Sequence, residues 1–103
     1  MGQPLVMSAT RPHRGRPRVW IEGKRLAAAG FTRGSRFNVV VKPSNQVLLK
    51  FLIADEGSRK VSGKGDRPII DIVGTLLEQA GLKSGDDVVI NYSPDVIEIE
   101  GAA

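Results

Sequence analysis

The chain contains no cysteine, one histidine and few aromatic residues: one tryptophan, one tyrosine and three phenylalanines among 103 residues. Without cysteine neither a disulfide nor a thiolate metal site can form, and we expect no metal and no cofactor. The longest apolar runs, Val47–Ile53 and Ile69–Val73, each contain a charged residue and are too short to cross a bilayer. Pro4 and the basic run from Arg11 interrupt any secretory signal. We therefore expect a cytoplasmic protein with no membrane partner.

Positive charge is abundant, and it is unevenly divided. Residues 1–65 hold 13 Lys/Arg against three acids, a net charge of +10, whereas residues 66–103 hold two basic residues against eight acids, a net charge of −6. Such a division predicts that one half of the chain faces a polyanion and the other half does not. Solubility alone is the competing interpretation.

An internal repeat organises the sequence. A shift of 51 residues aligns Arg16–Pro43 with Arg67–Pro94 without a gap, and nine of the 28 positions are identical. Chance matching at average composition gives about two. The identities include three glycines, at 23 and 74, 30 and 81, and 34 and 85. The match indicates a tandem duplication.

Each copy has the same local pattern. In the first copy, alternation predicts a strand through Val19 and Ile21, a short helix over Lys24–Ala29, and a second strand over Phe37–Val41 that turns into a last strand at Val47–Ile53. The second copy predicts the same elements: a strand through Ile70 and Ile72, a helix over Thr75–Ala80, a strand over Val88–Tyr92 and a strand over Val96–Glu100. The fold class is therefore mainly β with short helices, as β-α-β-β repeated twice.

The domain organisation follows from this repeat. We predict a flexible basic arm at 1–15, the first copy at 16–53, a solvated linker at 54–66 and the second copy at 67–101. Neither copy alone buries enough apolar surface to be stable, so residues 16–101 are expected to form one compact domain.

The first copy resembles a known family. The run Pro17–Leu26, continuing through Ala29–Gly34, resembles the SymE-like toxins within the AbrB/MazE swapped-hairpin superfamily. The second copy keeps the skeleton in Gly74, Leu77 and Ala80–Leu82. The resemblance implies an AbrB-like swapped-hairpin barrel, normally built by two chains and formed here within one chain as a pseudo-dimer.

The same resemblance implies a function. SymE-type toxins are described as acting on RNA, and AbrB-type regulators and MazE-type antitoxins bind duplex DNA. The leading hypothesis is RNA binding in a toxin–antitoxin setting, with a DNA-binding regulator or antitoxin as the alternative. A charge-driven protein-interaction module is the third hypothesis. A homodimer and a cognate regulator stay open as partners.

Nine residues form the candidate nucleic-acid interface. They are the cations of the arm and first copy together with the tryptophan that alternation places on the face opposite the core: Arg11, Arg14, Arg16, Arg18, Trp20, Lys24, Arg25, Arg33 and Arg36. The counterparts of the last four, Thr75, Leu76, Ser84 and Asp87, carry no positive charge, so the framework does not require cations there. Trp20 is predicted either to stack on a base or to pack beneath the arm.

Catalysis finds little support. His13 is the only histidine, so no second one can complete an acid–base pair, and ribonuclease activity rests on the family resemblance alone. We assign no catalytic residue. The linker segment Gly57–Lys64 has the wrong spacing for a phosphate-binding Walker loop. From its cations, Arg59, Lys60 and Lys64, we expect only nonspecific phosphate contacts.

Overall fold

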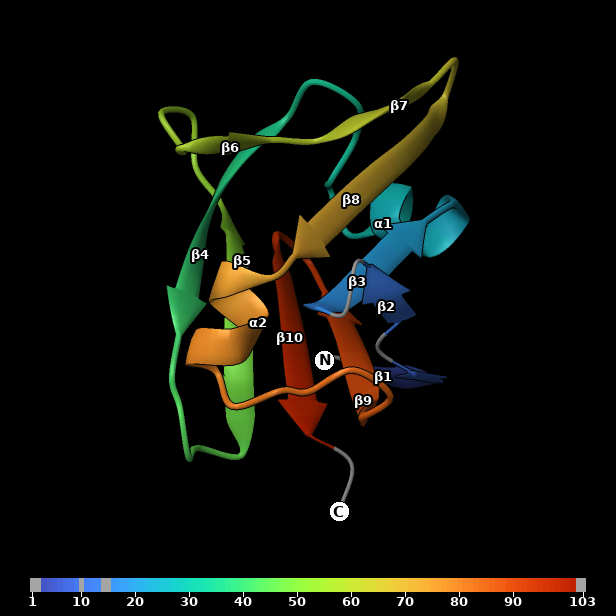
Figure 1. The fold of residues 1–103 in the computed structure, drawn as a ribbon. Helices are drawn as coiled ribbons and strands as arrows, with labels where there is room; N and C mark the ends of the chain where they lie inside the picture. Colours follow the sequence, from blue (N-terminus) through green and yellow to red (C-terminus); the bar gives the residue numbers. More distant parts are fainter. Residues whose placement is uncertain (1–2, 10, 14–15, 102–103) are drawn as a thin grey trace.

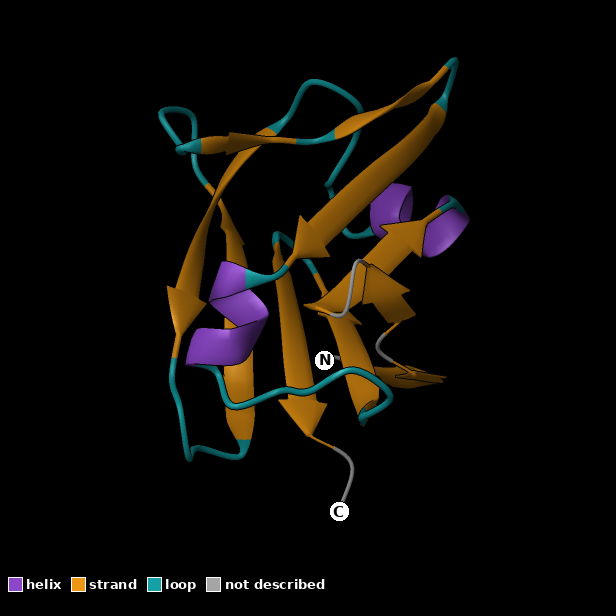
Figure 2. Cartoon of the chain, viewed as in Figure 1, coloured by secondary structure: helices purple, strands orange, loops and turns teal. Residues whose placement is uncertain are grey.

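The computed structural model describes residues 3–9, 11–13 and 16–101, with side chains described for 16–101. Within these residues the elements, in chain order, are β1 (Gln3–Ala9), β2 (Arg11–His13), β3 (Arg16–Glu22), α1 (Lys24–Ala28), β4 (Arg36–Val41), β5 (Val47–Ile53), β6 (Arg59–Lys60), β7 (Ser62–Lys64), β8 (Arg67–Val73), α2 (Thr75–Gln79), β9 (Asp87–Ser93) and β10 (Val96–Gly101). Figures 1 and 2 show a mainly β molecule with two short helices at the margins of the sheets. The predicted class, mainly β with short helices, is confirmed.

The strands form two antiparallel sheets. One has six strands in the order β1-β9-β10-β5-β4-β6, and the other has four in the order β2-β3-β8-β7. The hairpins β4–β5 and β9–β10 join through β5 and β10 in the centre of the larger sheet. Among the described residues the two sheets do not close into one continuous ring of strands. The finer prediction, an AbrB-like swapped-hairpin barrel, is therefore not confirmed.

The two copies repeat each other in backbone conformation. Ser44 and Asp95, which are 51 residues apart, are the non-glycine residues with positive φ among the described residues, and each has φ 64°. Each follows the proline of its hairpin turn, so both hairpins use the same turn geometry. The predicted strands and helices of both copies are present, and the ends given for them differ by at most one residue.

A local two-fold axis relates the copies where β3 meets β8. Trp20 lies opposite Asp71, its own counterpart in the repeat. The backbone N–H of Gly23 donates to the carbonyl of Pro68 (3.2 Å), and the equivalent N–H of Gly74 donates to the carbonyl of Pro17 (2.9 Å). These matched bonds show that the repeat in sequence is also a repeat in register.

The segments predicted as a flexible arm and a solvated linker contain strands. β1 and β2 lie within the predicted arm and pair with β9 and β3, and β6 and β7 lie within the predicted linker and pair with β4 and β8. Moreover, β2 and β7 are 51 residues apart and pair in the same register, Arg11 with Arg18 and Ser62 with Ile69. Each copy therefore begins about eight residues earlier than predicted, with a strand pair that passes from the larger sheet to the smaller one.

A physical reason for this difference is the pairing that each short segment gains. A strand edge offers unpaired N–H and C=O groups, and β3 and β8 provide such edges immediately after a tight turn. In the linker, Val61 supplies the anchor, because its side chain is only 1% exposed in the core. Backbone pairing and this single buried side chain thus order a segment that composition alone marks as solvated.

One hydrophobic core serves both copies. Its buried side chains come in equivalent pairs, among them Leu26 and Leu77, both 0% exposed, and Val19 and Ile70. Within this core, Phe37 makes ring contacts with Phe31 (5.8 Å between centroids) and Phe51 (5.6 Å).

Candidate nucleic-acid interface

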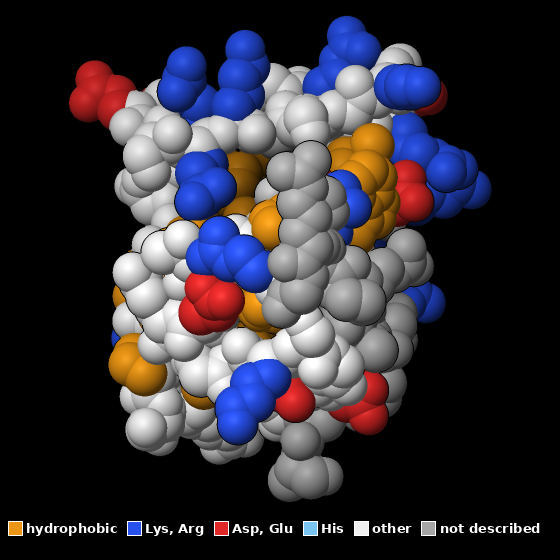
Figure 3. All heavy atoms as spheres, in the orientation of Figure 1, with side chains coloured by type: hydrophobic (Ala, Val, Ile, Leu, Met, Phe, Trp, Pro, Cys, Tyr) orange, Lys and Arg blue, Asp and Glu red, His pale blue; other side chains and the backbone are white. Residues whose placement is uncertain are grey.

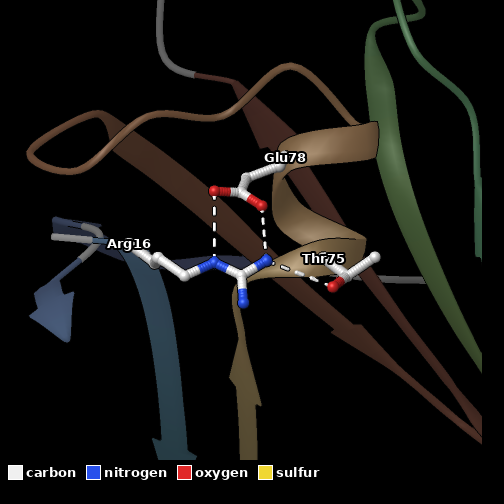
Figure 4. A network of polar contacts seen from close by, with 3 residues as sticks. All are labelled: Arg16, Thr75 and Glu78. Carbon is white, nitrogen blue, oxygen red and sulfur yellow. Dashed lines mark hydrogen bonds and ion pairs between the residues drawn. The ribbon is translucent and has the colours of Figure 1, made fainter. Parts of the chain in front are cut away.

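Arg16 joins the first copy to the second. It begins β3, and its guanidinium reaches the side chain of Glu78 on α2 (Figure 4). Nη2 donates to Oε1 of Glu78 (2.6 Å) and to Oγ1 of Thr75 (3.2 Å), while Nε donates to Oε2 of Glu78 (3.3 Å). The hydrogen bond from Arg16 lowers the pKa of Glu78. Both side chains are about half exposed, at 47% and 46%, so this ion pair stays within reach of solvent.

The approach of Arg16 to α2 needs a glycine. A Cβ atom added at Gly74 would lie 2.6 Å from the guanidinium carbon of Arg16, and the φ of Gly74 is 72°. Only glycine adopts such a backbone conformation readily. The glycine at this position therefore both ends β8 and makes room for the ion pair.

Arg18 is bound to Asp71. Its Nε and Nη2 donate to the two carboxylate oxygens at 2.8 and 2.7 Å, and its guanidinium carbon lies 4.9 Å from the ring centroid of Trp20. The bidentate bond raises the pKa of Arg18. Trp20 and Asp71 form a non-hydrogen-bonded pair of the ladder, where opposing side chains are closest. The charge of Arg18 is thus largely neutralised by the second copy, and one face of the indole already has a partner.

Lys24 and Arg25 lie on α1, which packs against β3 and β8 (Figure 1). Both side chains are exposed. Burial raises the pKa of the Tyr92 hydroxyl, and the charge of Arg25 partly opposes this shift. Lys24 lines a hollow together with Asp66 and Arg67. Two cations, one from each copy, therefore share this hollow with an acidic residue.

Arg33 and Arg36 meet two cations from the predicted linker. Arg36 lies directly opposite Lys60 in the pairing of β4 with β6, and Phe37 lies opposite Arg59. Arg33 and Lys60 line the same hollow of about 350 Å³. We call Arg33, Arg36, Arg59 and Lys60 the basic edge. Figure 3 shows Lys and Arg side chains gathered over β6 and β7 at the upper end of the molecule.

Among residues 16–101, no carboxylate forms an ion pair with the basic edge. The ion pairs among residues 16–101 use Arg16, Arg18, Lys50 and Arg67, and none includes a residue of the basic edge. Arg36 donates one hydrogen bond to the carbonyl of Gly57 (3.2 Å). Like charges directly opposite each other on paired strands are destabilising. The basic edge therefore carries a repulsion that a bound anion would relieve.

The structure divides the nine predicted residues. Arg16 and Arg18 are held in ion pairs, Lys24 and Arg25 lie on α1, and Arg33 and Arg36 belong to the basic edge. Arg11 lies in β2 opposite Arg18, and its side chain is not described. Arg14 lies outside the described residues.

The position of Arg59 and Lys60 is not evident from the sequence. Composition predicts cations of a loose linker, whereas the structure fixes both residues on a strand beside β4. Val61, an apolar residue between charged and polar neighbours, is the signal that this segment enters the core. The 51-residue shift alone does not reveal it, because Ser8–His13 and Arg59–Lys64 share no identical residue.

The described side chains offer no ready metal site. Among residues 16–101, no three His, Asp or Glu side chains come together as they do around a metal ion. His13 lies in β2, and its side chain is not described. Neither of the described helices, each five residues long, is long and apolar enough to cross a membrane. Comparison of the chain with protein-family models, curated proteins and solved structures finds no match.

Proposed function

We propose that this chain binds a nucleic acid, RNA in the first instance, through the basic edge. The observation that carries the proposal is the unneutralised cross-strand pair of Arg36 and Lys60, flanked by Arg33 and Arg59. Phosphates spaced along a polymer are suited to such a group of cations, and their binding releases counterions. Arginine adds bidentate contacts to phosphate oxygens.

The proposed interface includes fewer residues than the nine predicted from the sequence. Arg16 and Arg18 already have carboxylate partners in the second copy, so a phosphate would have to compete with Glu78 and Asp71. These two arginines instead hold the copies together. The basic edge then supplies most of the attraction.

The proposal extends to the fold. We infer a fused relative of the AbrB-like swapped-hairpin dimer, with both halves in one chain. Its support is the pairing of the two hairpins through β5 and β10, together with the two-fold register of β3 and β8. The resemblance of the first copy to SymE-like toxins is what favours RNA over DNA.

The test is a binding titration with labelled single-stranded RNA and duplex DNA across a salt series. In Arg59→Ala/Lys60→Ala we expect affinity for RNA to fall roughly tenfold or more. The slope of log affinity against log salt should become shallower by about 1.4, since each lost phosphate contact of a single strand accounts for about 0.7. The matched control is Lys42→Ala/Lys83→Ala, which removes the same charge from turns remote from β6. It should bind almost as the unmodified chain does.

Each other outcome has a defined meaning. Tighter binding to duplex DNA would favour the regulator or antitoxin alternative. Equal losses in the two double variants would mean that net charge, and not the basic edge, governs binding. Absence of binding to either polymer at low salt would remove the proposed function.

A further inference from the structure

A slot separates the two sheets beneath β6 and β7. It has a volume of about 300 Å³ and lies between β6 on one side and β8 on the other. Its lining combines polar, charged and apolar side chains, from Phe37, Ser58, Arg59, Lys60, Ser62 and the segment Ile69–Ile72. Figure 3 shows hydrophobic side chains at the bottom of a hollow below the cations of this region.

One wall of the slot is an open strand edge. The bonds from Gly23 to Pro68 and from Gly74 to Pro17 show that the even-numbered residues of β8 bond to β3. The odd-numbered residues direct their N–H and C=O groups to the opposite side. There, pairing with β7 ends at Ile69, whose carbonyl also accepts a hydrogen bond from the Ser62 hydroxyl (3.1 Å). The backbone donor and acceptor of Asp71 therefore face the slot.

The other surfaces of the slot have complementary chemistry. Arg59 and Lys60, both exposed, supply positive charge at one wall. The floor is apolar and formed by core side chains, with Phe37 2% exposed and Ile70 3% exposed. A cation, an apolar floor and an adjacent backbone donor and acceptor are groups that can contact a phosphate, the face of a base and the edge of a base.

We infer that this slot binds one unpaired nucleotide, so that the ligand of the basic edge is single-stranded. The inference rests on the proposed function and narrows its substrate class. In a duplex, the bases are stacked and paired inside, and none can enter a hollow roofed by β6 and β7. A peptide strand is a poorer match, because only Asp71 and Val73 offer backbone groups on the open side of β8, and strands usually run five or six residues.

The experiment compares ligands that differ only in their bases. The unmodified chain is titrated with a single-stranded RNA oligonucleotide, the same oligonucleotide made abasic, and a blunt RNA duplex of equal length, each at the same series of salt concentrations beginning at low salt. We expect the single strand with bases to bind roughly tenfold more tightly than the abasic strand, because stacking of a base contributes on that scale. The duplex is expected to behave like the abasic strand.

A variant that fills the slot tests its location. Ser58 lines the slot, its side chain is exposed, and only its backbone N–H is used, in a bond to Asn38 (3.0 Å). In Ser58→Leu the difference between the strands with and without bases should disappear, while the binding of the abasic strand stays unchanged. The matched control is Ser84→Leu, at an exposed turn of the second copy, which should keep the full difference.

The outcomes separate this inference from the proposed function. Equal, salt-sensitive binding of all three ligands overturns the slot and leaves the basic edge in place. Binding of none of them at low salt removes both. Retention of the base effect in Ser58→Leu shows that the base binds elsewhere and also overturns the slot. The comparison of ligands on the unmodified chain needs no variant, so it decides the matter even if a leucine at position 58 destabilises the fold.

Discussion

The two copies share a framework but differ in charge. Equivalent residues fill the same core positions, as Leu26 and Leu77 do, and both hairpin turns contain a residue with a φ of 64°. At the start of the equivalent strands β4 and β9, however, the first copy has Arg36 and the second has Asp87. Because one backbone accepts either sign of charge at this position, the positive charge of Arg36 is not needed for folding. The comparison separates what holds the molecule together from what it presents to a ligand.

The largest effect is expected where the copies are most alike. Leu26→Ala and Leu77→Ala each remove a fully buried side chain from the shared core, and each should lower the free energy of unfolding by about 2–5 kcal/mol. Urea unfolding of both variants measures the two losses. Similar losses in free energy of unfolding would confirm that the two copies contribute equally to stability. A much smaller loss in one variant would show that the stability of that copy does not depend on its buried leucine.

The next largest effect is expected from exchanging the charges of Arg36 and its counterpart Asp87. Arg36→Asp places the second copy's residue in the first, and we expect roughly tenfold weaker RNA binding with a melting temperature within a few degrees of the unmodified chain. The double variant Arg36→Asp/Asp87→Arg restores the net charge of +4 but moves the cation to the other copy. Binding should stay weak in the double variant. Recovery of affinity there would mean that the position of the charge is irrelevant, which contradicts the basic edge.

The smallest effect concerns the ion pair that joins the copies. Because Arg16 lowers the pKa of Glu78 in the folded state, the pair contributes stability above the ordinary glutamate pKa. That contribution is lost as the pH falls through the lowered value. In thermal melts, Glu78→Gln should therefore be slightly less stable than the unmodified chain near neutral pH, and the difference should vanish in acid. Glu56→Gln, at an exposed position outside the described ion pairs, should show no such trend.

The predictable part of the fold is the part that carries a periodic signal. Alternation correctly placed Val19 and Ile21 in the core, at 2% and 3% exposed, and left Trp20 on the other face. The glycines at 30 and 81 follow the last helical turns with positive φ, as a left-handed helix end requires. These features depend on neighbours in sequence, so they can be inferred from it.

The strands outside the predicted copies depend on tertiary partners. Pro12 and Gly63 occupy equivalent positions in β2 and β7, and both residue types are rare in strands. Neither segment has an apolar alternation, and each gains its order from the edge against which it pairs. The partners of Arg16 and Arg18 were likewise hidden, because Glu78 and Asp71 are more than 50 residues away in sequence. Counting cations finds the basic half of the chain, but it does not show which of them are already neutralised.

On the proposed fused-dimer fold, the pairing of Trp20 with Asp71 has a simple consequence. In a symmetric dimer of identical chains, a residue on the two-fold axis can face only a copy of itself, so the choices there are limited to side chains that tolerate their own kind. Two aspartates would repel each other there. In a single chain that restriction does not apply. The position on the local two-fold axis can then hold two unlike groups, with Arg18 bridging them, and each half can diverge without forcing the same change on the other.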